Sequence, residues 1–283
     1  MESEPVLEPL TFTRYLYPKI YVKHSLLVSI LEHQYDESLF WAYELYYSGF
    51  QEELFQYIIQ LYNQLFQEKN KKFIDFINNS FNEWKEEQDK DWIIGSIVGT
   101  LSHMDYSIDL FMKEYFNINC KSSKNKTKKA IIVCCKLENI TKYYTLSPIE
   151  KTYKYLQNVG LYKIRTNIKQ LFQGDYGNIK NEFYYNWIYY ASGSPIWLER
   201  INEFNGTVNN ETKKVEFLSE DWEELFYNTW GFEPDEQSQT IQDQIIGSNT
   251  VEQICIKDFC EKYGSPIVTK KITKPKKLVI KVS

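Results

Sequence analysis

Two pairs of closely spaced acidic residues are the best candidates for catalysis or metal binding in this sequence. Asp89 and Asp91 form an Asp-x-Asp sequence, and Asp235 is followed directly by Glu236. Carboxylates placed in this way can bind a divalent cation or act in acid–base catalysis. The alternative is that they begin helices or face water, because acidic residues are common in the first helical turn. Convergence of these carboxylates in one cleft would favour a metal-dependent enzyme.

The other chemistry-bearing residue types match no motif. The three histidines, His24, His33 and His103, have neither the His-Glu-x-x-His pattern nor the spacing of a zinc site. The five cysteines are an odd number without a Cys-x-x-Cys pair, which favours a reducing compartment. No glycine precedes a lysine and no Gly-x-Gly occurs, which excludes a Walker loop and a dinucleotide fingerprint. We therefore expect no cofactor and no metal, and the sequence leans against an enzyme.

A short pattern near the amino terminus concerns partner binding. Tyr21 is followed after four residues by Leu26 and Leu27, which matches the Tyr-x4-Leu-apolar pattern of helical peptides that dock on cap-binding translation factors. In an amphipathic helix, however, Leu26, Leu27 and Ile30 would simply face the core of their own protein. The sequence leaves both interpretations open.

The carboxyl-terminal segment is strongly basic. Residues 262–283 contain seven lysines and no acidic residue. The net charge of the whole chain is −5, so the net charge of the remaining residues is −12. Such a segment can contact nucleic acid, anionic lipid or an acidic protein by salt-sensitive attraction, or it can be a solvated tail. Its apolar residues at 278–282 offer a third option, an edge strand added to a partner's sheet. The predicted contact residues are Lys270, Lys271, Lys274, Lys276, Lys277 and Lys281.

Helical periodicity dominates the first hundred or so residues. Leu54, Ile58, Leu61 and Leu65 fall on one helical face, and Asp36 is placed to cap a preceding, nearly all-apolar helix that stops at Gly49. Further helices are predicted around residues 73–84 and 108–115. We expect residues 1–119 to form an all-α unit.

The composition changes at residues 120–129, which carry five lysines and no acid, as is typical of a linker or loop. We expect a second, mainly α unit over residues 130–264 and a basic tail over 265–283. The apolar run at 130–135 is a strand or the start of a helix, and Ser147-Pro148 predicts a helix start. A β-hairpin is predicted near 207–217.

Two more helices are predicted in this second unit. One is capped by Ser219 and stops at Gly231, and the other covers 251–259 with a cap at Asn249 or Thr250. The fold class is therefore mainly α, either a helical bundle or an irregular helical stack. The longest apolar run, residues 92–101, is too short to cross a bilayer, and the amino terminus lacks the features of a signal peptide.

The composition also carries a genomic bias. Arginine and alanine are scarce, at three residues each, while lysine, asparagine, isoleucine and tyrosine are abundant. Residues with G/C-rich codons are thus scarce and those with A/T-rich codons abundant, which indicates an AT-rich genome such as that of a large DNA virus or of some protists. Three sequence segments resemble uncharacterised proteins encoded by giant nucleocytoplasmic DNA viruses. They are RYLYPK (14–19), ESLFWAYELYYSGF (37–50) and WGFEPDEQSQTIQ (230–242).

This resemblance transfers no catalytic residue, but it implies a setting. It agrees with a protein of the infected cytoplasm, of a viral factory or of the virion. We expect a non-enzymatic helical scaffold or adaptor that binds other proteins in a transcription, translation or virion-assembly complex. The alternatives are a nucleic-acid accessory protein that binds through its basic tail and an enzyme that uses the dispersed carboxylates. The sequence leaves the oligomeric state open.

Overall fold

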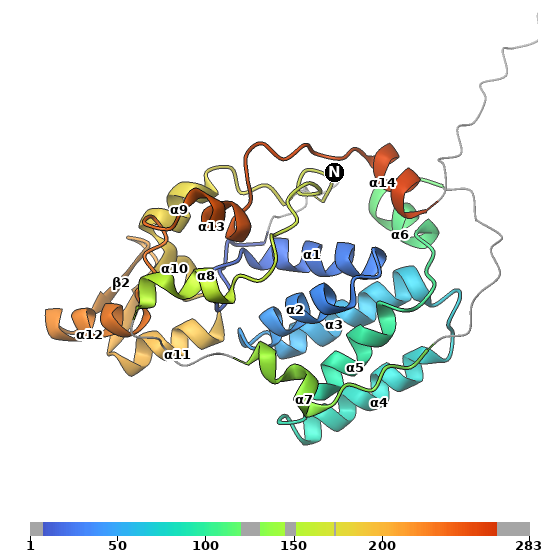
Figure 1. Ribbon diagram of the computed structural model, residues 1–283, viewed down its shortest axis with the longest axis horizontal. Helices are drawn as coiled ribbons and strands as arrows, with labels where there is room; N and C mark the ends of the chain where they lie inside the picture. The colour runs from blue at the N-terminus through green and yellow to red at the C-terminus, as the bar shows by residue number, and fades with distance from the viewer. Residues whose placement is uncertain (1–7, 120–130, 145–150, 173, 265–283) are drawn as a thin grey trace, which may run out of the picture.

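The computed structural model describes residues 8–119, 131–144, 151–172 and 174–264. Within these ranges the chain forms fourteen α-helices and one two-stranded hairpin, which confirms the mainly α fold (Figure 1). The α-helices are α1 (Lys19–Leu31), α2 (Tyr35–Tyr46), α3 (Gln51–Leu61), α4 (Phe73–Glu86), α5 (Trp92–Leu101), α6 (Asp109–Phe116), α7 (Leu137–Ile140), α8 (Tyr155–Val159), α9 (Ile179–Tyr185), α10 (Trp187–Ala191), α11 (Pro195–Glu203), α12 (Glu220–Trp230), α13 (Gln239–Ile245) and α14 (Ile256–Tyr263). A π-helix, η1 (Tyr62–Phe66), and two 3₁₀ turns, η2 (Thr141–Tyr143) and η3 (Thr152–Lys154), complete the helical elements. No helix of these ranges is long and apolar enough to cross a membrane.

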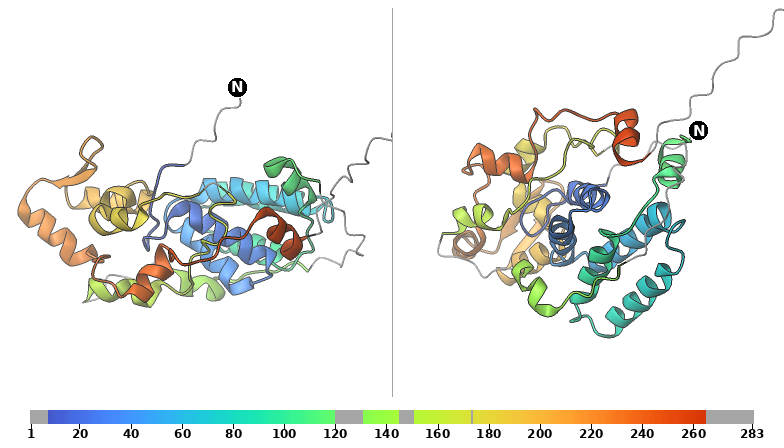
Figure 2. Two further views of the ribbon diagram at one scale, coloured as in Figure 1. Left: turned by 90° about the horizontal axis from the view of Figure 1, so that it is seen from above. Right: turned by 45° about the vertical axis from the view of Figure 1, so that its right-hand side comes forward.

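Helices α1 and α2 form the centre of the molecule (Figures 1 and 2). Helix α2 packs against α1, α3 and α5, and its side chains from Glu37 to Tyr46 are all buried. This explains why its sequence is apolar nearly all round. The predicted stop is confirmed, because Gly49 has a φ of +95°. Asp36, in contrast, does not cap the helix, because α2 begins one residue earlier, at Tyr35.

Helix α3 presents the predicted apolar face to this core. Leu54, Ile58, Leu61 and Leu65 are all at most 2% exposed. The helix then continues as the wider π-helix η1, where the Gln67 amide donates to the Tyr62 carbonyl at 2.9 Å, five residues back. This π-turn ends the helix and sends the chain into the turn before α4.

The face of helix α5 that contacts the extended segment, residues 131–136, consists of small and hydroxyl-bearing residues. The Val133 amide donates to Thr100 Oγ1 and the Cys135 amide donates to Ser96 Oγ, both at 2.9 Å. A Cβ on Gly99 would lie 3.2 Å from Val133 Cγ1, so the glycine makes room for this segment. Residues 131–136 are therefore neither a strand nor the start of a helix, because side chains of α5 bind their backbone amides instead.

The carboxyl-terminal half consists of short helices around the predicted hairpin. Strands β1 (Gly206–Asn209) and β2 (Lys214–Phe217) pair antiparallel, with Gly206 opposite Phe217 and Asn209 opposite Lys214. Ser219 precedes α12 as predicted but makes no side-chain cap hydrogen bond. The last helix was placed too early by the sequence, because residues 251–255 are irregular and α14 starts at Ile256. The predicted segments 120–129 and 265–283 and the Ser147-Pro148 start lie outside the described residues.

A single hydrophobic core contains side chains from both predicted units. The hydroxyl of Tyr17 donates to the Tyr162 carbonyl at 2.9 Å, and the Trp197 indole donates to the Thr13 carbonyl at 3.0 Å. A fully buried ion pair, Arg14 Nε to Glu44 Oε2 at 2.9 Å, lies near this junction. The two halves are thus joined by a shared hydrophobic core and by hydrogen bonds.

Candidate functional site

The predicted docking residues of α1 lie in the core. Tyr21, Leu26 and Leu27 are 1%, 0% and 2% exposed. This placement matches the alternative interpretation, in which the apolar residues face their own protein. A partner could reach them only if α1 left the fold. The lysines predicted to contact nucleic acid or an acidic partner all belong to 265–283, outside the described residues.

The four candidate carboxylates lie in two separate places. Asp89 and Asp91 precede α5, whereas Asp235 and Glu236 lie between α12 and α13, well away from α5 in Figure 1. Asp91 is buried, and its Oδ2 accepts a hydrogen bond from the Tyr47 hydroxyl at 2.5 Å. Asp235 and Glu236 are exposed. Within the described ranges, no three His, Cys, Asp or Glu side chains form a group that could hold a metal ion.

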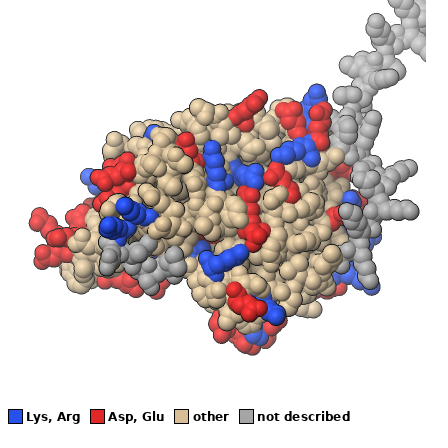
Figure 3. Space-filling model, viewed as in Figure 1, with Lys and Arg blue, Asp and Glu red and all other residues tan. Residues whose placement is uncertain are grey.

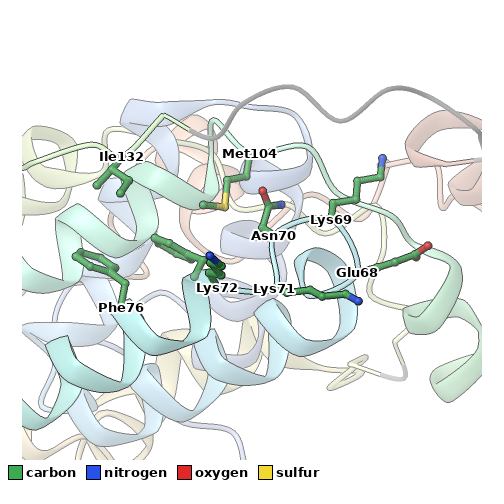
Figure 4. Close-up of a pocket in the computed structure, with 9 residues that line it drawn as sticks. Glu68, Lys69, Asn70, Lys71, Lys72, Phe76, Met104 and Ile132 are labelled. Carbon is green, nitrogen blue, oxygen red and sulfur yellow. The ribbon is translucent and has the colours of Figure 1, made fainter.

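The chain forms an open groove where η1 turns into α4. It has a volume of about 480 Å³. Its floor is apolar and comes from three segments, namely Phe73 and Phe76 of α4, Met104 after α5, and Ile132 of the extended segment. Figure 4 shows Ile132 and Met104 across the groove from Phe76. Ile132 is 64% exposed and Phe76 is half-buried, whereas Phe73 and Met104 are buried beneath them, so Ile132 and Phe76 form the apolar surface that a partner can reach.

Several hydrogen bonds fix the turn that forms the groove's edge. The Asn70 side-chain amide donates to the Asp105 carbonyl at 3.1 Å, and the Tyr62 hydroxyl donates to the Asn70 carbonyl at 2.8 Å. The Phe73 and Phe76 rings stack with their centroids 5.2 Å apart. The floor is therefore already formed in the free protein, which lowers the entropic cost of binding.

A second lobe lies on the other side of the same turn. It has a volume of about 450 Å³, shares Glu68 and Lys71 with the first, and includes Leu110 of α6. Leu110 is 41% exposed, and Gln64 of η1 has a buried Oε1 without a hydrogen-bond donor among the described residues. The π-helix positions Gln64 at this edge. We call the two lobes together the lysine-rimmed groove.

Lysines dominate the rim of this groove. Lys69, Lys71 and Lys72 line it together with one acid, Glu68. None of the three lysines forms an ion pair with a residue that the structure describes. With three lysines against one glutamate, the rim thus has a net positive charge beside an apolar floor. This combination suits a partner that carries both apolar and acidic side chains.

A further depression of about 420 Å³ lies beside Tyr162 and Asn167 but has a different character. Besides Lys163, it contains the ion pair of Arg165 and Glu37, in which two hydrogen bonds of 2.7 and 2.9 Å join the side chains. The pKa of Arg165 is raised, chiefly by this bond to Glu37. The charges here hold two segments together, in contrast to the lysines of the groove.

Sequence reasoning missed the lysine-rimmed groove, because its floor combines residues from three distant segments. A local signal existed in the KNKK sequence of residues 69–72, which follows an amphipathic helix and precedes Phe73. Comparisons of the chain with protein-family models, with curated proteins and with solved structures found no match.

Proposed function

We propose that the protein is a non-enzymatic adaptor whose lysine-rimmed groove binds an acidic, amphipathic helix of a partner protein. The observation that carries this proposal is the accessible apolar surface of Ile132 and Phe76 beside lysines that form no ion pair with a described residue. A helix with apolar side chains at i, i+3 or i+4 and i+7 can place them along such a floor. Acidic residues on its flanks would meet Lys69, Lys71 and Lys72.

The biological setting of this adaptor rests on the sequence alone. Two features support an origin in a large DNA virus. They are the resemblance of segments 14–19, 37–50 and 230–242 to proteins of such viruses and the amino-acid composition typical of an AT-rich genome. We place it in a transcription, translation or virion-assembly complex of the infected cytoplasm, a viral factory or the virion. A partner in such a complex would be recognised by the chemistry of its helix.

A designed peptide tests the groove directly. The probe is a fluorescent helical peptide with leucine at i, i+3, i+4 and i+7 and glutamate on both flanks. Its control carries lysine in place of glutamate. We expect fluorescence anisotropy to show binding of the glutamate peptide, and its affinity should fall as salt rises. The lysine peptide should bind at least tenfold more weakly, because like charges then meet at the rim.

Two charge-matched variants locate the binding. Reversal of Lys71 and Lys72 to Glu should weaken binding of the glutamate peptide at least tenfold. Reversal of Lys151 and Lys214 to Glu, which are both exposed and absent from the groove's lining, should leave it unchanged. Equal losses in both variants, or no binding by the wild type, would contradict the proposal.

The nucleic-acid alternative is tested with the same proteins. Single-stranded RNA and duplex DNA serve as probes for the full chain and for a chain without residues 265–283. Salt-dependent binding that disappears on truncation, combined with no binding of either peptide, would replace the adaptor with a nucleic-acid accessory protein.

A further inference from the structure

Arg200 of α11 is a buried cation without a counter-ion. Its side chain is 4% exposed, and it makes no hydrogen bond or ion pair with any residue that the structure describes. Both Nε and Nη1 are fully buried, although each is an obligatory donor. Trp230, at the end of α12, adds a third fully buried donor without an acceptor, its indole Nε1. We call these three nitrogens the Arg200–Trp230 donor cluster.

Aromatic rings hold the guanidinium group in place. The Cζ atom of Arg200 lies 3.7 Å from the ring centroid of Trp230 and 4.5 Å from that of Trp197. A cation–π contact supplies no acceptor oxygen, so the buried Nε and Nη1 remain donors without an acceptor. Burial lowers the pKa of Arg200 to about 10, so the group remains charged at neutral pH.

The groups around Arg200 leave its charge uncompensated. Arg14, Tyr15, Tyr155 and Glu203 are the titratable residues near enough to influence it. Arg14 forms its ion pair with Glu44. Glu203 is exposed and does not come within 4.0 Å of the guanidinium nitrogens. A buried charge without a partner is strongly unfavourable, which indicates that an acceptor from outside the described residues completes this site.

We propose that the Arg200–Trp230 donor cluster binds the oxyanion group, carboxylate or phosphate, of a small molecule. On the Nε edge of the planar guanidinium, the N–H groups of Nε and Nη2 are parallel and match two oxygens of such an anion. Nη1 lies on another edge of the same plane, and the indole N–H of Trp230 supplies a further donor. Trp230 is partly exposed, so the donors lie one side chain beneath the surface. This site is separate from the lysine-rimmed groove, since it is built from α11 and α12.

Thermal unfolding of the full chain tests the proposal. The sample is titrated with orthophosphate or with acetate against chloride at constant ionic strength, and tryptophan fluorescence is read in the same samples. We expect a saturable rise in Tm of about 4 °C at ten times Kd with at least one of the two anions. A saturable change in tryptophan emission should follow the same Kd. The phosphate arm and the acetate arm show which oxyanion the cluster accepts.

Variants separate this site from general salt effects, because phosphate also stabilises proteins by exclusion from their surface. Arg200→Met should abolish the saturable rise while its Tm in chloride equals or exceeds that of the wild type, since an uncompensated buried charge is removed. Lys214→Met, which removes an exposed charge, should keep the rise.

Three results would overturn the proposal. The first is the absence of a saturable change with either anion, and the second is an equal rise in Arg200→Met. The third is a saturable rise that occurs only in Glu203→Gln, because Glu203 would then be the counter-ion in the wild type.

Discussion

His24 of α1 is a buried histidine in an apolar setting. It is 6% exposed, its Nδ1 has no partner among the described residues, and its ring lies 5.2 Å from that of Phe172. Burial lowers the pKa of His24 to about 4, with a smaller contribution from Lys23, while Glu8 acts in the opposite direction. The ring of Tyr21 stacks on that of His24, and Tyr176 in turn contacts Tyr21. The neutral imidazole is therefore the form that the folded protein accommodates.

This arrangement predicts a loss of stability in mild acid. The unfolded histidine takes up a proton below about pH 6.5, whereas the folded one does so only near pH 4, so the unfolded state holds more protons between these values. The free energy of unfolding should fall by about 3 kcal/mol between pH 7 and pH 4 because of this residue. Urea unfolding at pH 7, 5.5 and 4 measures this change. His24→Gln should show a smaller dependence on pH, and parallel curves for the two proteins would contradict the assignment.

The burial of His24 and Arg200, and the pKa shifts that it causes, could not be predicted from the sequence. Nothing in the sequence around His24 or Arg200 distinguishes them from exposed residues, because burial is set by segments far along the chain. Gly174, for instance, packs against His24 from 150 residues away, and a Cβ there would lie 2.8 Å from the ring. Local signals were more reliable where the cause is local, as at Gly49, whose positive φ ends α2.

At the scale of elements, the extended segment 131–136 depends on the hydroxyl groups of α5. Thr100 Oγ1 donates to the Ser96 carbonyl at 2.7 Å and accepts from the Val133 amide at 2.9 Å. Thr100→Val keeps the shape and removes the acceptor. We expect the free energy of local opening at Val133 to fall by about 1–2 kcal/mol, with little change at α2. Native-state hydrogen exchange measures both sites.

Thr229 of α12 offers a matched control. Its hydroxyl also donates to the carbonyl four residues back, at 2.8 Å from the Leu225 oxygen, but it is not part of α5. Thr229→Val should leave the exchange of Val133 unchanged. Unaltered exchange in Thr100→Val would show that packing on α5, and not this hydrogen bond, holds the segment.

Elements with a strong helical period were predictable, and those governed by tertiary contacts were not. The faces of α3 and α4 and the hairpin follow from local patterns of apolar and turn residues. The π-turn at η1 leaves no such pattern, and its effect is to widen one turn beside the candidate groove. The segment 131–136 was ambiguous because its amides bind side chains of another element. The groove depends on both of these features.

At the scale of the molecule, the core runs without interruption through both halves of the described chain. Phe12, near the amino terminus, stacks edge-on against Phe183 at 5.8 Å, and its amide donates to the Tyr190 carbonyl at 3.1 Å. Tyr17 packs its ring at 5.1 Å from Trp41 and donates its hydroxyl to the Tyr162 carbonyl. Composition alone placed a boundary between residues 119 and 130. It could not show that segments on either side of that boundary share one interior.

This continuity predicts that the two halves unfold together. Trp197 of α11 is fully buried and donates its indole N–H to the Thr13 carbonyl at 3.0 Å. Trp197→Phe removes this donor and should lower the free energy of unfolding by roughly 2–3 kcal/mol through the lost hydrogen bond and the smaller ring. Hydrogen exchange in increasing urea should report the same loss at α2, in the first half, as at α11. If the halves were independent, α11 would lose stability while α2 kept its wild-type midpoint, because no shared core would transmit the change.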